Sequence, residues 1–281
     1  MKAIIVHGGA GKIRRKDEIL ERIEVCKRAA EKGFYILSNK GSSIDATVEA
    51  VKILENHPLF DAGIGAYLTE KGEVELDAGI MNGALLKVGA VAGIKHVKNP
   101  IILAKTIMET SKHNFLIGEG AEEFAKDHGM EMVPNEYFIT ERTKEIFQEK
   151  FGDTVGSVAI DEMGRITAAV STGGTALKSS GRVGDSPIVG SGFYANKLYG
   201  AVATGIGEDI MKVVLSFKIM LYIKDGIKIA VKRVIKDLDE INGYAGLIAI
   251  DKEGNIEFSY NTEAMFYAFK KEGMMEAEGG I

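Results

Sequence analysis

The order of strand-like and helix-like segments is the feature that most limits the fold of this 281-residue chain. A short β-rich run opens the chain, and helical patterns follow over residues 17–38 and 44–55, whereas strand patterns dominate after residue 154. Strands and helices therefore come in clusters and do not alternate strictly, as a doubly wound parallel sheet would require. The pattern predicts an α+β fold in which helices cover largely antiparallel sheets.

Cap and turn residues set the expected bounds of the elements. Ser42 followed by Asp45 is a capping-box match at the start of the second helix, and Pro58 ends that helix. The same patterns predict helices over residues 100–110, 119–128, 208–224 and 226–239, and strands over 83–94, 154–160, 165–171 and 194–203. The polar segment 130–153 is the best candidate for a boundary within the chain.

Composition excludes several classes of partner. The net charge is −5 with 27% charged residues, and no basic block suggests a nucleic acid. The first residues, MKAIIVHGG, hold too few apolar side chains for a signal peptide or a membrane span, so we expect a cytoplasmic protein. Cys26 is alone and lies in a helical pattern, which predicts a structural thiol. Abundant Lys, Glu and Ile favour a heat-adapted source.

The glycine-rich loops do not match nucleotide-binding motifs. The loop VHGGAGK at 6–12 lacks the first glycine of a P-loop, and Ile13 stands where Ser or Thr is needed. The loops GIGAYL and GIGEDI lack the third glycine of a dinucleotide fingerprint. No G-x-S-x-G elbow or H-E-x-x-H motif exists, and all five His residues precede Thr154. A His-centred triad or a catalytic zinc site therefore finds little support.

Three threonines stand in glycine-rich settings after residue 152. They are Thr154 in GDTVG, Thr172 in STGGT and Thr204 in ATGIGED, and the segment GRVGDSP between them holds Arg182 and Asp185. Each motif alone has a structural explanation, because Thr favours strands and Gly-Asp-Ser-Pro favours turns. Taken singly, they therefore leave function open.

In this order, the motifs resemble the plant-type L-asparaginases and isoaspartyl peptidases, which are N-terminal-nucleophile hydrolases. HGGAG near the start, LENHPLFDAGIGA at 54–66 and the segment 76–100 agree, so the resemblance covers nearly the whole chain. It implies a four-layer αββα sandwich. It also implies hydrolysis of L-asparagine to L-aspartate and ammonia, and of β-aspartyl dipeptides.

The resemblance further implies that a precursor cleaves its own Asp153–Thr154 bond. The products are an alpha subunit, 1–153, and a beta subunit, 154–281, which together form one structural domain. Cleavage has a chemical purpose, because a Thr hydroxyl needs a base, and an α-amine with a pKa of ~7.7–8.0 is partly neutral at pH 7. Gly152 is expected to give the backbone freedom for a strained geometry at this bond.

The resemblance assigns a role to each site residue. The nucleophile is Thr154, oriented by Thr172; Thr204 and Gly205 form the oxyanion hole; Arg182 holds the substrate carboxylate; Asp185 and the carbonyl of Gly207 hold its ammonium. No cofactor is expected for catalysis, and the resemblance allows a structural sodium ion on the backbone carbonyls of Leu54, Glu55, His57, Phe60, Ala62 and Ile64. The expected assembly is a homo-oligomer, a dimer of cleaved protomers, without nucleic acid or membrane partners.

Two residues depart from the family pattern. Asp153 stands where most relatives have Gly, which resembles the sister branch of glycosylasparaginases, and its carboxylate is a candidate base for self-cleavage. Asp61 stands where relatives usually have Asn. The STGG motif and the absence of a secretion signal favour the asparaginase branch. The alternatives are a glycosylasparaginase and a non-catalytic α/β binding protein.

Overall fold

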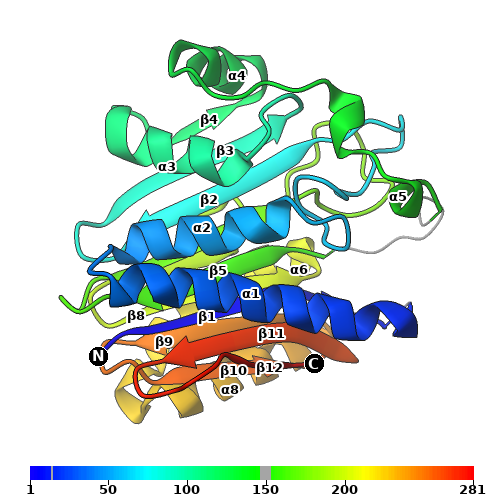
Figure 1. Cartoon of the computed structure of the whole chain (residues 1–281). Helices are drawn as coiled ribbons and strands as arrows, with labels where there is room; N and C mark the ends of the chain where they lie inside the picture. The colour runs from blue at the N-terminus through cyan, green and yellow to red at the C-terminus, as the bar shows by residue number, and fades with distance from the viewer. Residues whose placement is uncertain (14, 146–152) are drawn as a thin grey trace.

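The protein folds into four layers, in which two sheets lie face to face between two layers of helices (Figure 1). The computed structural model describes residues 1–13, 15–145 and 153–281. Three apolar cores hold the layers together: one between helices and the larger sheet, one between the sheets, and one between the smaller sheet and its helices. The predicted α+β class and αββα sandwich are confirmed.

The larger sheet has eight strands and the smaller sheet four. In spatial order the larger sheet contains β12 (Glu278–Gly280), β11 (Ala264–Lys271), β1 (Ala3–Gly11), β5 (Val155–Ile160), β6 (Ile166–Thr172), β2 (Leu76–Asn82), β3 (Lys87–Ile94) and β4 (Phe115–Ile117). The smaller sheet contains β10 (Ile256–Tyr260), β9 (Ala245–Asp251), β8 (Tyr199–Gly205) and β7 (Phe193–Ala195). Only the β3–β4 pair is parallel among these ladders.

Helices cover both outer faces. The larger sheet is covered by α1 (Ile19–Ser38), α2 (Ser43–Glu55) and α3 (Pro100–Thr110), with α4 (Gly118–Asp127) beside β3 and β4. The smaller sheet is covered by α6 (Gly207–Val213), α7 (Leu215–Lys218) and α8 (Ile227–Asp239). Short elements are η1 (Lys16–Glu18), η2 (Asn135–Phe138), α5 (Glu141–Glu145), η4 (Ile219–Leu221) and η5 (Ile223–Asp225). Among the residues described, no helix is long and apolar enough to cross a bilayer.

Two residues predicted from the sequence, the cap Ser42 and the lone Cys26, lie at the start of α2 and within α1. Ser42 Oγ accepts a hydrogen bond from the Asp45 backbone N–H at 3.1 Å, so the predicted cap is confirmed. Cys26 lies fully buried on the inner face of α1, and burial raises the pKa of its thiol to about 12. That thiol is protonated at neutral pH, so the prediction of a structural cysteine is confirmed.

Two segments that were each predicted as one continuous element are divided in the structure. The helix expected over 208–224 ends at Val213, because Val214 adopts a left-handed conformation with φ 53° that breaks the helical ladder. The strand expected over 194–203 is split at Asn196, whose Oδ1 accepts hydrogen bonds from Leu198 and Tyr199 N–H groups and closes a turn between β7 and β8. Side-chain periodicity does not report such local backbone breaks.

The substitution Val214→Gly is expected to stabilise the protein. A β-branched residue in the left-handed region is strained by ~1–2 kcal/mol, and glycine removes that strain at an entropic cost of ~0.5–1 kcal/mol. We expect the free energy of unfolding, measured by urea denaturation, to rise by about 0.5–1 kcal/mol. Val213→Gly is the matched control inside α6 and should lower it by about 1 kcal/mol. Equal decreases in the free energy of unfolding of the two variants would contradict the assignment of strain to Val214.

Candidate active site

Antiparallel pairing of β5 with β6 brings Thr154 and Thr172 together. Val155 pairs with Ser171, so the residue before β5 lies opposite the last residue of β6. The Thr154 hydroxyl donates to Thr172 Oγ1 at 3.2 Å, and the Thr172 hydroxyl donates to the carbonyl oxygen of Asp153 at 2.9 Å. The Gly174 N–H donates to Thr172 Oγ1 at 2.9 Å and fixes its position. One hydroxyl thus contacts both the expected nucleophile and the carbonyl of the expected cleavage bond.

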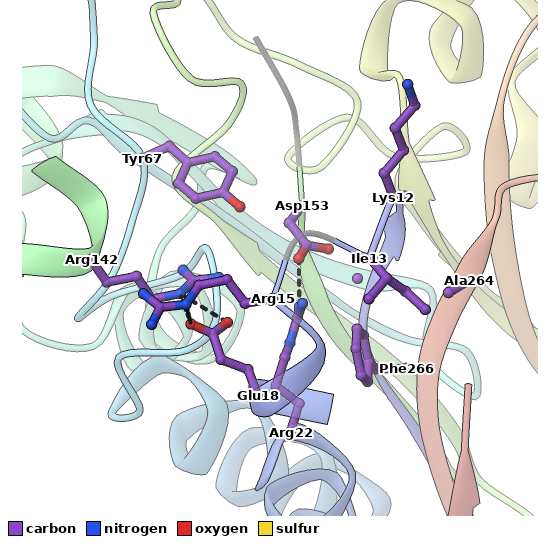
Figure 2. A pocket seen from close by; sticks show the side chains of 12 residues that line it. Lys12, Ile13, Arg15, Glu18, Arg22, Tyr67, Arg142, Asp153, Ala264 and Phe266 are labelled. Atoms are coloured by element: carbon purple, nitrogen blue, oxygen red, sulfur yellow. Dashed lines mark hydrogen bonds and ion pairs between the residues drawn. The ribbon is translucent and has the colours of Figure 1, made fainter. Parts of the chain in front are cut away.

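The Asp153 side chain accepts hydrogen bonds from two neighbouring groups. Arg22 Nη2 donates to Oδ2 at 2.6 Å (Figure 2), and the Thr154 N–H donates to Oδ1 at 3.3 Å. The Asp153 backbone N–H donates to Asp61 Oδ2 at 3.3 Å. Gly9, with φ 101°, leaves room for this side chain, since a Cβ there would lie 1.1 Å from Oδ1. The Thr154 hydroxyl donates elsewhere, so these contacts do not support Asp153 as its base. The expected role of Gly152 falls outside the described residues.

Asp61 accepts backbone N–H groups through both of its carboxyl oxygens. It is buried, and burial raises its pKa to about 8, so the side chain is mostly protonated at pH 7. Its Oδ1 accepts a hydrogen bond from the Tyr67 N–H at 2.7 Å. Its Oδ2 accepts the Asp153 N–H at 3.3 Å, so both oxygens act as acceptors, and the NH2 group of an Asn could not accept the second of these bonds.

A small pocket opens beside Thr154 and gathers most of the predicted site residues. Its lining includes Asp153, Thr154, Thr172, Arg182, Asp185, Gly205 and Gly207. Thr204 is not part of that lining: it is fully buried at the end of β8, and its Oγ1 has no hydrogen-bond partner among the described residues. The fold therefore brings together residues that lie more than fifty positions apart in the sequence.

Opposite charges stand side by side at the far wall of this pocket. A Cβ on Gly207 would lie 2.8 Å from Asp185 Oδ1 and 2.9 Å from Arg182 Nη2, so both side chains pack against this glycine. Burial raises the pKa of Asp185 to about 7, and its Oδ2 has no hydrogen-bond partner among the residues described. Arg182 donates through Nε and Nη2 to Glu208 at 2.9 and 2.8 Å. The Asp185 carboxyl group can accept a ligand ammonium, and the neighbouring Arg182 can bind a ligand carboxylate, so the pair suits a zwitterionic ligand.

Sequence reasoning missed Arg22 and Glu208. Arg22 lies on the buried stripe of α1, three residues before Val25 and four before Cys26. A cation on an apolar stripe needs a buried partner, and this was the available indication. Glu208 directly follows Gly207 within ATGIGED, but nothing in the sequence indicated that it would bind Arg182.

The loop expected to bind sodium follows α2 and turns back on itself. The Glu55 carbonyl oxygen accepts a hydrogen bond from the Ile64 N–H at 2.8 Å. Gly63, with φ 53°, packs against the same oxygen, since a Cβ there would lie 2.3 Å from it. A Cβ on Gly65 would lie 2.4 Å from the Pro58 oxygen and 2.9 Å from the Phe60 oxygen, so carbonyls converge here. Hard cations favour such oxygen donors. Within the described part of the chain, no cluster of three His, Cys, Asp or Glu side chains could hold a metal.

Comparison with known proteins identifies the family of this chain. The sequence profile of the asparaginase family matches residues 1–152 and 143–278. A plant-type L-asparaginase from Pyrococcus abyssi is 42% identical, with all of both chains covered. The isoaspartyl peptidase of Escherichia coli is 42% identical, covering 95% of this chain and 92% of its own. The isoaspartyl peptidase/L-asparaginase of Mus musculus is 40% identical, covering 98% and 89%. The chain therefore belongs to the asparaginase family of hydrolases, together with plant-type L-asparaginases and isoaspartyl peptidases.

Proposed function

We propose that this enzyme cleaves itself before Thr154 and then hydrolyses L-asparagine and β-aspartyl dipeptides with Thr154 as nucleophile. The observation that carries the proposal is the chain of hydrogen bonds from the Thr154 hydroxyl to Thr172 and from Thr172 to the Asp153 carbonyl. It aligns a nucleophile, an orienting hydroxyl and a polarised carbonyl at the edge of one pocket. The family membership supports the same reaction class.

Self-cleavage proceeds as an acyl shift followed by hydrolysis. Thr154 Oγ1 attacks the carbonyl carbon of Asp153, and the Thr172 hydroxyl stabilises the negative charge on the carbonyl oxygen. The C–N bond breaks, the hydroxyl proton ends on the Thr154 nitrogen, and an ester joins the two residues. Water hydrolyses the ester, giving fragments 1–153 and 154–281. The new α-amine is then the base next to the hydroxyl.

Substrate hydrolysis repeats this chemistry on a side-chain amide. The Thr154 amine takes the hydroxyl proton, Oγ1 attacks the amide carbon, and the C–N bond breaks as the leaving nitrogen takes that proton and departs as ammonia or an amino acid. Water then hydrolyses the aspartyl ester on Oγ1, which releases aspartate and restores the Thr154 hydroxyl. Thr204 and Gly205 are proposed as the oxyanion hole at the end of β8. Arg182 binds the substrate α-carboxylate, and Asp185 with the Gly207 carbonyl binds its ammonium. Glu208 keeps Arg182 extended towards the pocket until the substrate arrives.

A substrate panel tests the proposal. Purified enzyme should release ammonia and aspartate from L-asparagine, and aspartate from β-aspartyl dipeptides, but no sugar from a glycosyl-asparagine. Sugar release at a comparable rate would instead identify a glycosylasparaginase. An uncut chain that binds these compounds without hydrolysing them would indicate a binding protein.

The pH dependence of KM should report Asp185. Its pKa of about 7 means that the side chain loses its negative charge as the pH falls, and a neutral acid cannot pair with the substrate ammonium. We expect KM for L-asparagine to rise by roughly tenfold per pH unit below pH 7. Succinamic acid, which lacks the ammonium, is the matched control and should not show this rise. Parallel KM profiles for both compounds would contradict the role of Asp185.

A structural sodium ion and a dimer complete the proposal. The carbonyls of Pro58 and Phe60, which converge beside Gly65, support an ion in this loop. Its proposed ligands are the backbone carbonyls of Leu54, Glu55, His57, Phe60, Ala62 and Ile64. The ion would order the loop that carries Asp61. Thermal denaturation in sodium and in tetramethylammonium salts tests this, and sedimentation of the cleaved protein tests the dimer.

A further inference from the structure

A pocket rich in cations lies directly behind Asp153, on the side of α1 (Figure 2). Its charged lining comprises the basic residues Lys12, Arg15, Arg22 and Arg142 and the acidic residues Glu18 and Asp153. Asp153 also lines the small pocket that contains Thr154. Because Asp153 lines both pockets, its departure after self-cleavage would open one pocket towards the other.

Arg22 is fixed by contacts that do not depend on Asp153. Its Nη2 donates to the Gly8 carbonyl at 2.7 Å, and its guanidinium lies 3.9 Å from the ring centre of Phe266 and 5.3 Å from that of Phe60. The residue is only 8% exposed. Arg22 therefore keeps its position when Asp153 leaves, with its charge still directed towards the cleft.

Loss of Asp153 leaves this cation without its anionic partner. A buried charge that loses its partner is strongly destabilising, so the emptied position favours another anion. Further donors are available beside it, because Arg22 Nε and Arg142 Nη1 are buried without hydrogen-bond partners among the residues described. The vacated position is thus suited to a carboxylate.

The Asp153 carboxylate marks where that anion would lie. Its Oδ2 lies 2.6 Å from Arg22 Nη2, and its Oδ1 lies 3.3 Å from the Thr154 nitrogen. A carboxylate in this position is therefore adjacent to the reacting threonine. In the proposed reaction the Thr154 amine gives its proton to the leaving nitrogen of a β-aspartyl dipeptide, so that nitrogen lies beside the amine. The carboxylate of the leaving residue is two bonds from this nitrogen, and the position that contacts the Thr154 nitrogen is therefore within its reach. Resting on the proposed function, we infer that Arg22 binds the leaving-residue carboxylate and so favours dipeptides with a free carboxyl terminus.

A pair of substrates tests this role. The cleaved enzyme is assayed with β-aspartyl-alanine and with β-aspartyl-alaninamide, which lacks the carboxylate, and rates are normalised to the amount of fragment that begins at Thr154. The wild-type ratio of kcat/KM, free acid over amide, should be tenfold or more. Arg22→Met should lower this ratio by about tenfold, and Arg22→Lys should give an intermediate ratio. Arg15→Met, at the exposed rim of the same pocket, should keep the wild-type ratio.

Arg22 also binds Asp153 in the precursor, so Arg22→Met can slow self-cleavage as well as change the choice of substrate. The comparison is therefore repeated between Asp153→Gly and Asp153→Gly/Arg22→Met, in which no Asp153 carboxylate needs a partner. An unchanged ratio after removal of Arg22 would overturn the inference. So would a wild-type ratio near one, as expected if the carboxylates of the released fragment stay on Arg22. Failure to hydrolyse any dipeptide or L-asparagine would instead overturn the proposed function itself.

Discussion

Thr154→Ala should yield a single uncut polypeptide of 30.3 kDa without asparaginase activity. In the proposed mechanism, the substitution removes the hydroxyl that attacks in both self-cleavage and substrate hydrolysis. Loss of a nucleophile lowers kcat by roughly 10⁴–10⁶-fold in hydrolases. Denaturing electrophoresis measures the cleavage, and ammonia release from L-asparagine measures the activity.

Thr154→Ser is the matched control, because it keeps a hydroxyl at the same position. It should cleave and should retain measurable hydrolysis, whereas the alanine variant shows neither. The two variants should unfold at similar temperatures if the alanine variant is folded. Wild-type activity in folded Thr154→Ala protein would exclude Thr154 as the nucleophile.

Thr172→Val should slow self-cleavage by about 10²–10³-fold, because it removes the one side-chain donor that the described residues offer to the Asp153 carbonyl, while it keeps the shape of the side chain. It also removes the acceptor of the Thr154 hydroxyl, so the nucleophile loses its orientation. The fraction of cut chain, followed by electrophoresis from the time of purification, measures the rate.

Thr172→Ser keeps the hydroxyl and should cleave at a rate close to that of the wild type. Because Gly174 N–H also donates to Thr172, the valine variant should be checked for folding by circular dichroism. Cleavage of a folded valine variant at the wild-type rate would show that the Thr172 hydroxyl does not assist the reaction.

The layers of this fold were predictable because they depend on side-chain periodicity and motif order. Helix α2 begins at its cap and α3 at Pro100, so local chemistry fixed both starts. The break at Val214 was not predictable, since a β-branched residue ordinarily avoids positive φ. The segment 194–203 is divided by a local turn at Asn196, which the strand-like composition of the segment conceals.

The site was predictable where motifs carry it and not where distant elements meet. The threonine motifs indicated Thr154 and Thr172, whose contact follows from strand pairing. The ion pair between Arg22 and Asp153 joins residues 131 positions apart, and no local pattern links them. Asp61 was recognised as a departure, but its raised pKa follows from burial that only the fold creates.

The central claim is tested most directly by the intact mass of purified protein, followed over time together with its asparaginase activity. The account predicts two fragments, one of which begins at Thr154, and activity that rises in proportion to that fragment. Full activity in a sample that consists only of the unbroken chain would contradict it.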